Sequence, residues 1–491
     1  MNSTSTQVHF IAIGGAVMHN LALALHKKGF QVTGSDDEIY DPAKSRLAAA
    51  GILPKQMGWS VENIHPKLDA VILGMHAKAD NPELLEAQRL GIKVYSFPEY
   101  VYEQCKHKQR IVIAGSHGKT SITSIILHVL KYFNRSFDYL VGAQIEGFDL
   151  MVQLTSDAPI IIIEGDEYLS SPIERRSKFH FYHPHIALFS GISWDHFNVF
   201  PTFESYVKTF EELADALPKA GTILFDETDD ILRVIGEKDR EDVSKLPYKA
   251  HPYIVENGQV SLQTKLGNIP ILLFGEHNMK NLEGARLILE KLGIQSVQFY
   301  EAIQHFKGAA KRLEKVADNS NLVVYRDFAH APSKVKATTE ATKQLFPTRR
   351  LIACYELHTY SSLNQSFLPH YAQTLDAADT AILFFSPQTL AIKQMEPLSE
   401  DIIRKAFGRE DILVFTDKDA LESYLKTQNW FQTNLLLMSS GTFGGMDFLN
   451  FANLLMELPV NEVFPELRVT EEKPDEGSWS GLLKKVKNTL K

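Results

Sequence analysis

The segment from Ile111 to Ser121 reads IVIAGSHGKTS and contains residue types that bind a polyphosphate. Its apolar residues predict a strand, and its glycines let backbone N–H groups approach an anion closely. Lys119 can supply a positive charge to two phosphates, and Thr120 can hold Mg²⁺ at a helix N-terminus. The general loop pattern has a glycine where this chain has Ile113, so the alternative is that GKT only opens a helix. The predicted phosphate site comprises Gly115, Ser116, His117, Gly118, Lys119, Thr120 and Ser121.

Acidic residues follow the next apolar strand. The segment Glu164–Glu167 comes directly after the strand expected at Pro159–Ile163. Carboxylates at the C-terminal end of such a strand, near a phosphate loop, are well placed to hold Mg²⁺. The pair Asp195–His196 follows another expected strand, Ile186–Phe189. On its own, a histidine at this place would be interpreted as structural or as a surface residue.

Strands and helices that could position these residues alternate along most of the chain. The pattern predicts an α/β fold with three consecutive domains: a Rossmann-like N-terminal domain, a central domain of the P-loop type and a Rossmann-like C-terminal domain. The expected bounds are 1–108, 109–314 and 315–460. Residues 461–491 are expected to form a linker, rich in Glu and Pro, and a short amphipathic tail.

Composition narrows the class of protein. The chain has 491 residues, which is too long for a single hydrophobic core, and its net charge of −9 argues against nucleic-acid binding. Its two cysteines cannot form a disulfide framework. No apolar run reaches the ~20 residues that a membrane span requires, and the N-terminus lacks the pattern of a signal peptide. These features predict a cytoplasmic protein.

The loop GSHGKTS resembles the shortened phosphate loop, G-[TS]-x-G-K-[TS]-[TS], of the muramyl ligases. Similar segments extend over roughly residues 8–455, so the resemblance covers nearly the whole chain. It implies an ATP-dependent ligase of bacterial cell-wall synthesis or recycling. The other classes considered are a P-loop kinase or ATPase acting on a sugar acid, and a nucleotide-binding regulator without catalysis.

The resemblance also implies roles for individual residues. Lys119, Glu164 and His196 are expected to be catalytic, and Thr120, Glu164 and His196 to bind Mg²⁺, with two ions in all. Some relatives carry a carbamylated lysine where this chain has Glu211, so no carbamate is expected. Further ATP-binding residues are expected in three segments that resemble family motifs, at His277, Asn278, Asn281, Arg312, Asp327 and His330.

The N-terminal turn IGGAVM at 13–18 resembles the turn with which muramyl ligases hold the pyrophosphate of a UDP-sugar. Taken alone it is a weak signal, because the third glycine of a dinucleotide-binding turn is missing at the expected place. The second strand ends in Gly34-Ser35-Asp36, which also matches the family. The expected UDP-sugar-binding residues are Gly14, Gly15, Ala16, Ser35, Asp36 and His76.

The expected substrates are ATP, UDP-N-acetylmuramate and an amine. The segments at 175–184, 195–201 and 439–445 resemble the family member that adds the tripeptide L-Ala-γ-D-Glu-meso-diaminopimelate. The alternative is the member that adds L-alanine. The segment Glu356–Ser361 matches neither, because the arginine that each uses near the amine is absent. The tail at 479–491 has apolar residues on one helical side and lysines around them, so it is either solvated or makes a weak membrane or protein contact.

Overall fold

A computed structural model describes residues 5–194, 199–256, 258–308 and 313–462. The chain divides into two compact units, residues 1–314 and 315–491. The predicted tail at 479–491 lies outside the described residues, as do Asp195, His196 and Arg312. Within the described ranges, no helix is long and apolar enough to cross a membrane.

The first unit begins with a parallel sheet whose strand order is β2-β1-β3-β4. Its strands are β1 (Gln7–Ile11), β2 (Gln31–Ser35), β3 (Ala70–Leu73) and β4 (Val94–Ser96). Its helices are α1 (Ala16–Lys27), α2 (Ala43–Ala49), α3 (Pro82–Arg89) and α4 (Phe97–Cys105), with a 3-10 turn, η1, at Val61–Asn63. The chain reverses its direction across the sheet at β1, and open α/β sheets bind ligands at such a switch point.

A second sheet of seven strands follows, in the order β11-β10-β9-β5-β8-β6-β7, and β5 lies at its centre. Its strands are β5 (Gln109–Ala114), β6 (Asp138–Leu140), β7 (Val152–Gln153), β8 (Ile160–Glu164), β9 (Ile186–Phe189), β10 (Thr222–Asp226) and β11 (Ser244–Tyr248). The six strands other than β7 run parallel, and β7 pairs antiparallel with β6. The loop after β5 therefore opens between β8 and β9 at the carboxyl edge of the sheet.

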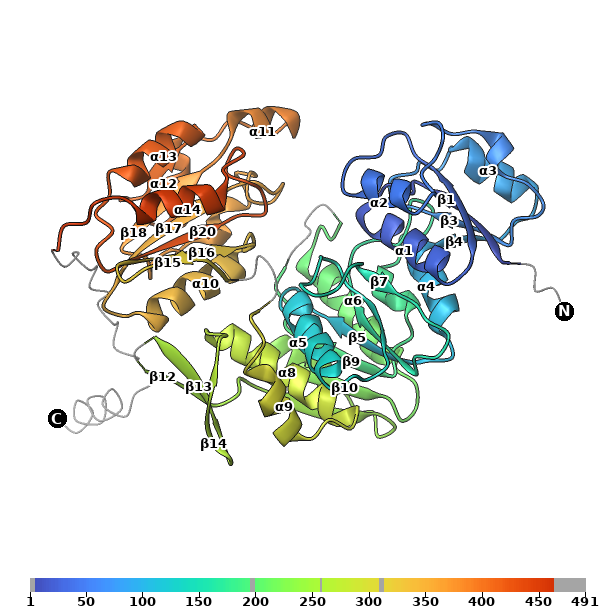
Figure 1. Ribbon diagram of the computed structural model, residues 1–491, viewed down its shortest axis with the longest axis horizontal. Coiled ribbons are helices and arrows are strands. Elements are labelled where there is room, and N and C mark those ends of the chain that lie inside the picture. Colours follow the sequence, from blue (N-terminus) through green and yellow to red (C-terminus); the bar gives the residue numbers. More distant parts are fainter. Residues whose placement is uncertain (1–4, 195–198, 257, 309–312, 463–491) are drawn as a thin grey trace, which may run out of the picture. The chain divides into compact units, whose positions relative to one another are not determined.

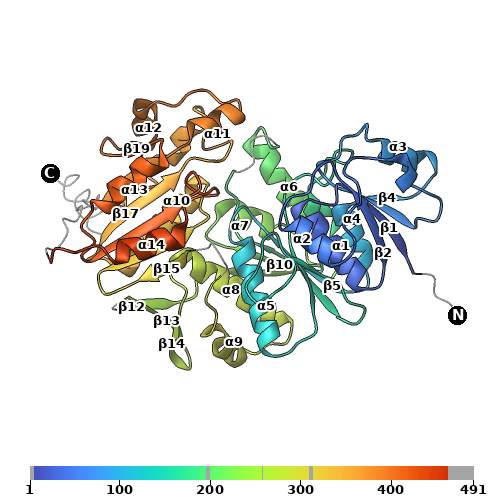
Figure 2. The same cartoon turned by 45° about the horizontal axis from the view of Figure 1, so that its top comes forward.

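Helices cover this second sheet. They are α5 (Lys119–Tyr132), α6 (Phe203–Asp215), α7 (Asp230–Gly236), α8 (Glu276–Lys291) and α9 (Ser296–Ile303), with the 3-10 turn η2 at Lys178–Phe181. Figures 1 and 2 show α5 and α8 side by side, and these two helices contact each other extensively. Three antiparallel strands, β12 (Tyr253–Glu256), β13 (Gln259–Thr264) and β14 (Gly267–Ile271), form a small separate sheet.

The first two sheets share one hydrophobic core. Alternate residues of the central strands, such as Val112 on β5 and Ile161 on β8, join a buried cluster that also contains Leu21 of α1 and Val101 of α4. Contacts of α1 with β7 and of α4 with η2 connect the two sheets through this cluster. Residues 1–314 therefore form one unit although they contain two α/β sheets.

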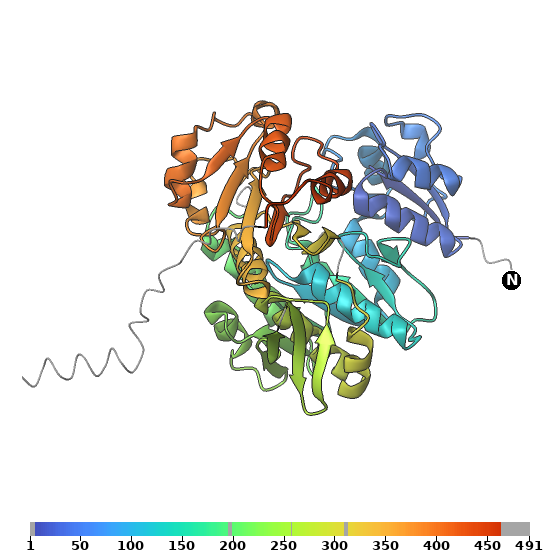
Figure 3. The same cartoon turned by 60° about the vertical axis from the view of Figure 1, so that its left-hand side comes forward.

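The second unit has a sheet of six strands in the order β15-β16-β20-β17-β18-β19. The strands are β15 (Glu314–Asp318), β16 (Leu322–Asp327), β17 (Arg350–Glu356), β18 (Thr380–Phe384), β19 (Leu413–Phe415) and β20 (Thr433–Met438). The helices are α10 (Pro332–Leu345), α11 (Pro387–Ile392), α12 (Glu400–Phe407), α13 (Lys418–Lys426) and α14 (Phe448–Met456), with the 3-10 turn η3 at Leu368–Tyr371. In Figure 3 the sheet and helices of this unit are coloured from yellow through orange to red. Pairings from β16 to β19 are parallel.

These sheets confirm the α/β fold and the three-domain architecture expected from the sequence. The boundary expected after residue 108 stays a prediction, since the structure groups residues 1–314 together.

Candidate active site

The predicted phosphate loop connects the centre of the second sheet to a helix. Strand β5 ends at Ala114, and α5 begins at Lys119 directly after Gly118. Gly118 has a φ of 77°, and a Cβ there would meet the Asn281 side chain of α8. Gly115 has a φ of 130°, and a Cβ there would collide with Ser190. Both positions therefore require glycine, and the loop lies tightly against β9 and α8.

The ammonium group of Lys119 is buried beside acidic residues. Its Nζ donates to Glu167 at 2.7 Å and to the carbonyl of Gly115 at 2.5 Å. Burial acts to lower the pKa of Lys119, but the charges of Glu167 and Asp166 outweigh it, and the net effect is a raised pKa. Lys119 is therefore a permanent positive charge within the loop.

A second pair of predicted residues meets at the ends of β8 and the loop. The Thr120 hydroxyl donates to Glu164 at 2.7 Å, and the backbone N–H of Gly142 donates to the other oxygen of Glu164 at 2.9 Å. A carboxylate and a hydroxyl are the hard oxygen ligands that Mg²⁺ prefers, so these two side chains fit that ion. Among the described residues there is no group of three or more His, Cys, Asp or Glu side chains arranged to hold a metal. His196, the expected third ligand, lies outside those residues.

The Ser116 hydroxyl makes its hydrogen bonds to other parts of the protein. Its Oγ accepts the backbone N–H of Ser193 at 2.8 Å and lies 2.8 Å from the hydroxyl of Tyr206. Tyr206 is a fully buried residue of α6 and also reaches Glu167 at 3.4 Å. Neither Tyr206 nor the pairing of Glu167 with Lys119 was expected from the sequence.

Three of the expected ATP-binding residues lie at the start of α8. Asn278 donates to the carbonyl of Phe274 at 2.9 Å, and Asn281 lies against Gly118 of the phosphate loop. Burial lowers the pKa of His277 to about 4, so its imidazole is neutral near pH 7. The structure thus brings α8 to the phosphate loop.

The N-terminal turn forms a second compact site. Asp36, just after β2, accepts the backbone N–H of Gly14 at 2.7 Å. Burial raises the pKa of Asp36, against the lowering effect of that hydrogen bond. His76 is exposed, and its charge acts on Asp36, so the two side chains lie near each other. Gly15 caps α1, and Ala16 is its first residue.

Ser35 is the exception among the residues expected at this turn. Its side chain is 1% exposed, and its hydroxyl donates to the buried carboxylate of Glu83. Glu83 in turn accepts from the Asn63 amide at 2.7 Å. The Ser35 hydroxyl is therefore engaged inside the domain, and its carbonyl accepts the backbone N–H groups of Ala12 and Ile13.

In the second unit, polar residues gather at the carboxyl ends of neighbouring strands. Asp327 ends β16 and accepts the backbone N–H of Ala329 at 2.6 Å, and His330 follows with its ring bonded to the carbonyl of Phe328. Glu356 ends β17 and is 3% exposed. Its carboxylate accepts the Ser439 hydroxyl and the backbone N–H of Phe443, the latter at 2.8 Å.

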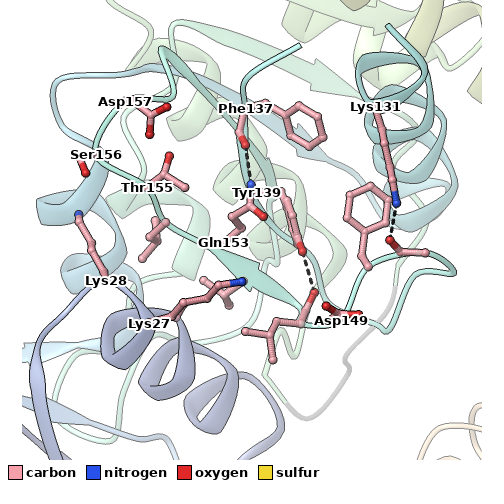
Figure 4. A pocket seen from close by; sticks show the side chains of 16 residues that line it. Lys27, Lys28, Lys131, Phe137, Tyr139, Asp149, Gln153, Thr155, Ser156 and Asp157 are labelled. Atoms are coloured by element: carbon pink, nitrogen blue, oxygen red, sulfur yellow. Dashed lines mark hydrogen bonds between the residues drawn. The ribbon is translucent and has the colours of Figure 1, made fainter. Parts of the chain in front are cut away.

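Two pockets lie away from all of these predicted residues. The first, of about 610 Å³, is in the first unit, and Figure 4 shows Lys27 and Lys28 at the end of α1 on one side of it and Lys131 on the other. The second, of about 470 Å³, lies at the amino-terminal ends of β5 and β9. No residue of the predicted site lines either pocket.

A parallel sheet with a central glycine loop, a lysine in that loop and a carboxylate that binds the neighbouring threonine from the adjacent strand is typical of nucleotide-binding enzymes that handle phosphoryl groups. Family models agree with this class and refine it. Residues 7–109 match the Mur ligase family catalytic domain, residues 113–289 the Mur ligase middle domain and residues 311–441 the Mur ligase glutamate ligase domain. The chain belongs to the Mur ligase family, whose members are ATP-dependent amide ligases.

Relatives and solved structures agree with this family. The UDP-N-acetylmuramate–L-alanine ligase of Limosilactobacillus reuteri is 31% identical over 86% of this chain and 93% of the relative. The corresponding ligase of Lactiplantibacillus plantarum is 30% identical over 86% and 94%. A murein peptide ligase from Neisseria meningitidis has 25% identity and a TM-score of 0.55 over 62% of this chain and 99% of that one. A UDP-N-acetylmuramate–alanine ligase structure from Thermotoga maritima, 19% identical, shares the fold with a TM-score of 0.65 over 92% and 98%.

Proposed function

We propose that this ligase joins the carboxylate of UDP-N-acetylmuramate to the amine of L-Ala-γ-D-Glu-meso-diaminopimelate, in the recycling of peptidoglycan. UDP-N-acetylmuramate is the shared substrate in the names of the relatives and of the Neisseria meningitidis structure, which supports the sugar half of the proposal. The observation that carries it is the loop after β5, where Lys119 donates to the carbonyl of Gly115 and Thr120 donates to Glu164 at the end of β8. A cytoplasmic location remains a prediction.

The reaction divides into two steps. An oxygen of the substrate carboxylate attacks the γ-phosphorus of ATP, the bond to the β–γ bridging oxygen breaks, and ADP leaves from an acyl phosphate. The amine nitrogen then attacks the acyl carbon, loses a proton and expels inorganic phosphate. In this scheme Lys119 neutralises the phosphate charge, and α8 holds the nucleotide close to the loop.

Mg²⁺ would be held by Thr120 and Glu164, with His196 expected as a further ligand, and it would neutralise charge on the phosphates. The oxygen atoms of Thr120 and Glu164 fit this ion, and the expectation of two ions rests on the resemblance to the family. Arg312, Asp327 and His330 remain proposed nucleotide contacts. Gly14, Gly15, Asp36 and His76 are proposed to hold the UDP-sugar, because they lie together at the switch point after β1.

The choice of amine rests on the second unit. His358 lies with its Nδ1 3.7 Å from Glu356, and a side chain at Gly441 would collide with both residues. No arginine takes the place at His358 that relatives use near the α-carboxylate of a small amino acid. A tripeptide carries its carboxylates farther from the reacting amine, so contacts elsewhere in this unit can supply its affinity.

L-Alanine is the second candidate amine, and the names of the two relatives favour it. The deciding experiment measures ADP release and amide product with saturating ATP and UDP-N-acetylmuramate, using the tripeptide, L-Ala, L-Ser and Gly in turn. We expect the highest kcat/KM with the tripeptide. A preference for L-alanine of about tenfold or more, roughly 1.4 kcal/mol in transition-state binding, would replace recycling with synthesis.

A further inference from the structure

A buried carboxylate, Glu167, faces the phosphate-binding lysine. Glu164 ends β8, and Asp166 and Glu167 follow it. Each of these three acids has a different partner: Glu164 binds Thr120, Asp166 binds Lys178 at 2.6 Å, and Glu167 binds Lys119 at 2.7 Å. The Glu167 side chain is 1% exposed and that of Lys119 is 15% exposed. Because water screens this pair poorly, the charge of Glu167 offsets much of the charge that Lys119 would offer to a phosphate.

Hydrogen bonds from two other segments hold Glu167 in this position. Ser193 donates its backbone N–H to Ser116 Oγ, which leaves the Ser116 proton free to be donated to Tyr206, whose hydroxyl donates to Glu167. Counted over the whole residue, Ser116 is 4% exposed, and Tyr206 and Glu167 are 0% exposed. The carboxylate thus accepts from Tyr206 of α6 in addition to Lys119, and Ser116 of the loop acts on it only through Tyr206.

We propose that Glu167 is an internal counter-ion of Lys119 that the phosphates of ATP must replace, and that Tyr206 is the positioning residue that fixes it. This inference rests on the role of Lys119 in the proposed function. Glu167 and the carbonyl of Gly115 accept two of the three N–H groups of the Lys119 ammonium, so a phosphate has to compete with Glu167 for this lysine. When ADP leaves, Glu167 recovers Lys119, which favours product release.

The pairing of Glu167 with Lys119 also predicts that small anions bind weakly to the phosphate loop. Inorganic phosphate has to compete with a prepositioned carboxylate and has no adenine contacts to compensate. ATP brings a larger charge and contacts to α8, so it can displace Glu167. The pair therefore selects nucleotides over small anions.

The test is direct titration of ATP, ADP and inorganic phosphate, with Mg²⁺ present and UDP-sugar absent. Glu167→Gln keeps the shape of the side chain and removes its charge. We expect this variant to bind ATP and ADP at least about fivefold more tightly than the natural protein, since the competing anion is gone. Inorganic phosphate should also bind more tightly. Tyr206→Phe should shift ATP affinity in the same direction by a smaller factor, because the carboxylate is then less firmly held.

Two matched variants control for lost buried contacts. Asp138→Asn breaks the ion pair with Lys108 (2.6 Å) near the opposite end of β5, and Tyr139→Phe removes a buried hydroxyl that donates to the carbonyl of Leu150. Both should lower Tm and leave the Kd for ATP unchanged. Unchanged or weaker ATP binding in Glu167→Gln overturns the inference. If that variant does not fold, as judged by Tm, Tyr206→Phe decides by the same criterion.

The two proposals fail in different ways. If the natural protein forms no amide from UDP-N-acetylmuramate with the tripeptide or with any of the three amino acids, the proposed function is wrong. If it forms the amide but Glu167→Gln shows no gain in nucleotide affinity, only the counter-ion role is wrong.

Discussion

Lys119 lies where the loop and the acids after β8 converge, and its charge is maintained by Glu167 and Asp166. Lys119→Ala should lower kcat by at least about 100-fold, because it removes the side chain placed to neutralise the γ-phosphate. ADP release measured with both substrates checks this. Lys131→Ala is the control, since Lys131 lies in the last turn of the same helix and donates to the carbonyl of Gly147. A near-normal kcat in Lys119→Ala would show that this loop does not bind the phosphates of ATP.

His277 gives the protein a sensitivity to acid. Burial lowers its pKa from 6.5 to about 4, so the unfolded chain takes up a proton between these values while the folded protein does not. Its contribution is therefore an increasing loss of stability as the pH falls from about 6.5 towards about 4. We expect Tm to decrease less between pH 7.5 and pH 5 in His277→Gln than in the natural protein. Other buried histidines contribute to both curves equally, so parallel curves would refute this role.

Some residues of the candidate site can be identified from the sequence, and others cannot. Lys119 and Thr120 belong to a local pattern, so their place where a strand leads into a helix could be predicted from the sequence, and their role toward ATP stays a prediction. Glu167 carried the same signal as its acidic neighbours, and nothing local distinguishes the acid that pairs with the lysine from the acid that faces Thr120. Tyr206 lies on a helix far along the chain, and its meeting with Ser116 depends on tertiary packing.

At the scale of elements, the tight contact between α8 and the phosphate loop depends on Gly118. Gly118→Ala should cost activity by about tenfold or more, since a Cβ would displace Asn281 and strain a residue with a φ of 77°. Gly293→Ala is a matched control: its φ is 81°, and no atom lies within 4 Å of the added Cβ. The control should lose stability and keep its kcat and its KM for ATP. Equal kinetic losses in both variants would show that backbone strain alone is responsible.

Strands with a continuous apolar pattern were predictable almost to the residue. Ile186–Phe189 has the predicted bounds, and the strand expected at Pro159–Ile163 is Ile160–Glu164, because buried parallel strands read as unbroken apolar runs. The small sheet β12-β13-β14 was not predicted. Its strands have many exposed polar residues, so no run of apolar residues marks it. Register and strand order also required the structure, since they depend on contacts between distant segments.

At the scale of the molecule, one buried amide connects the first two sheets. Asn20 of α1 is fully buried, accepts the backbone N–H of Met151 at 2.9 Å and donates to the carbonyl of Ala16 at 2.7 Å. Asn20→Leu should destabilise the protein by about 1–3 kcal/mol, because the Met151 N–H is left without this acceptor. Thermal unfolding checks this, with Asn63→Leu at an exposed residue of the 3-10 turn η1 as a comparison. A Tm equal to that of the natural protein would exclude a role for this bond in joining the sheets.

The shared core of residues 8–243 has an evolutionary consequence. A recombination event that exchanged the first 108 residues with those of a relative would separate Leu21 and Val101 from the residues with which they share a core. The cluster of the second unit is drawn from residues after 314 alone, so a crossover near that position would carry an intact core with it. Exchange of the second unit between related genes should therefore preserve folding better than exchange of the first 108 residues.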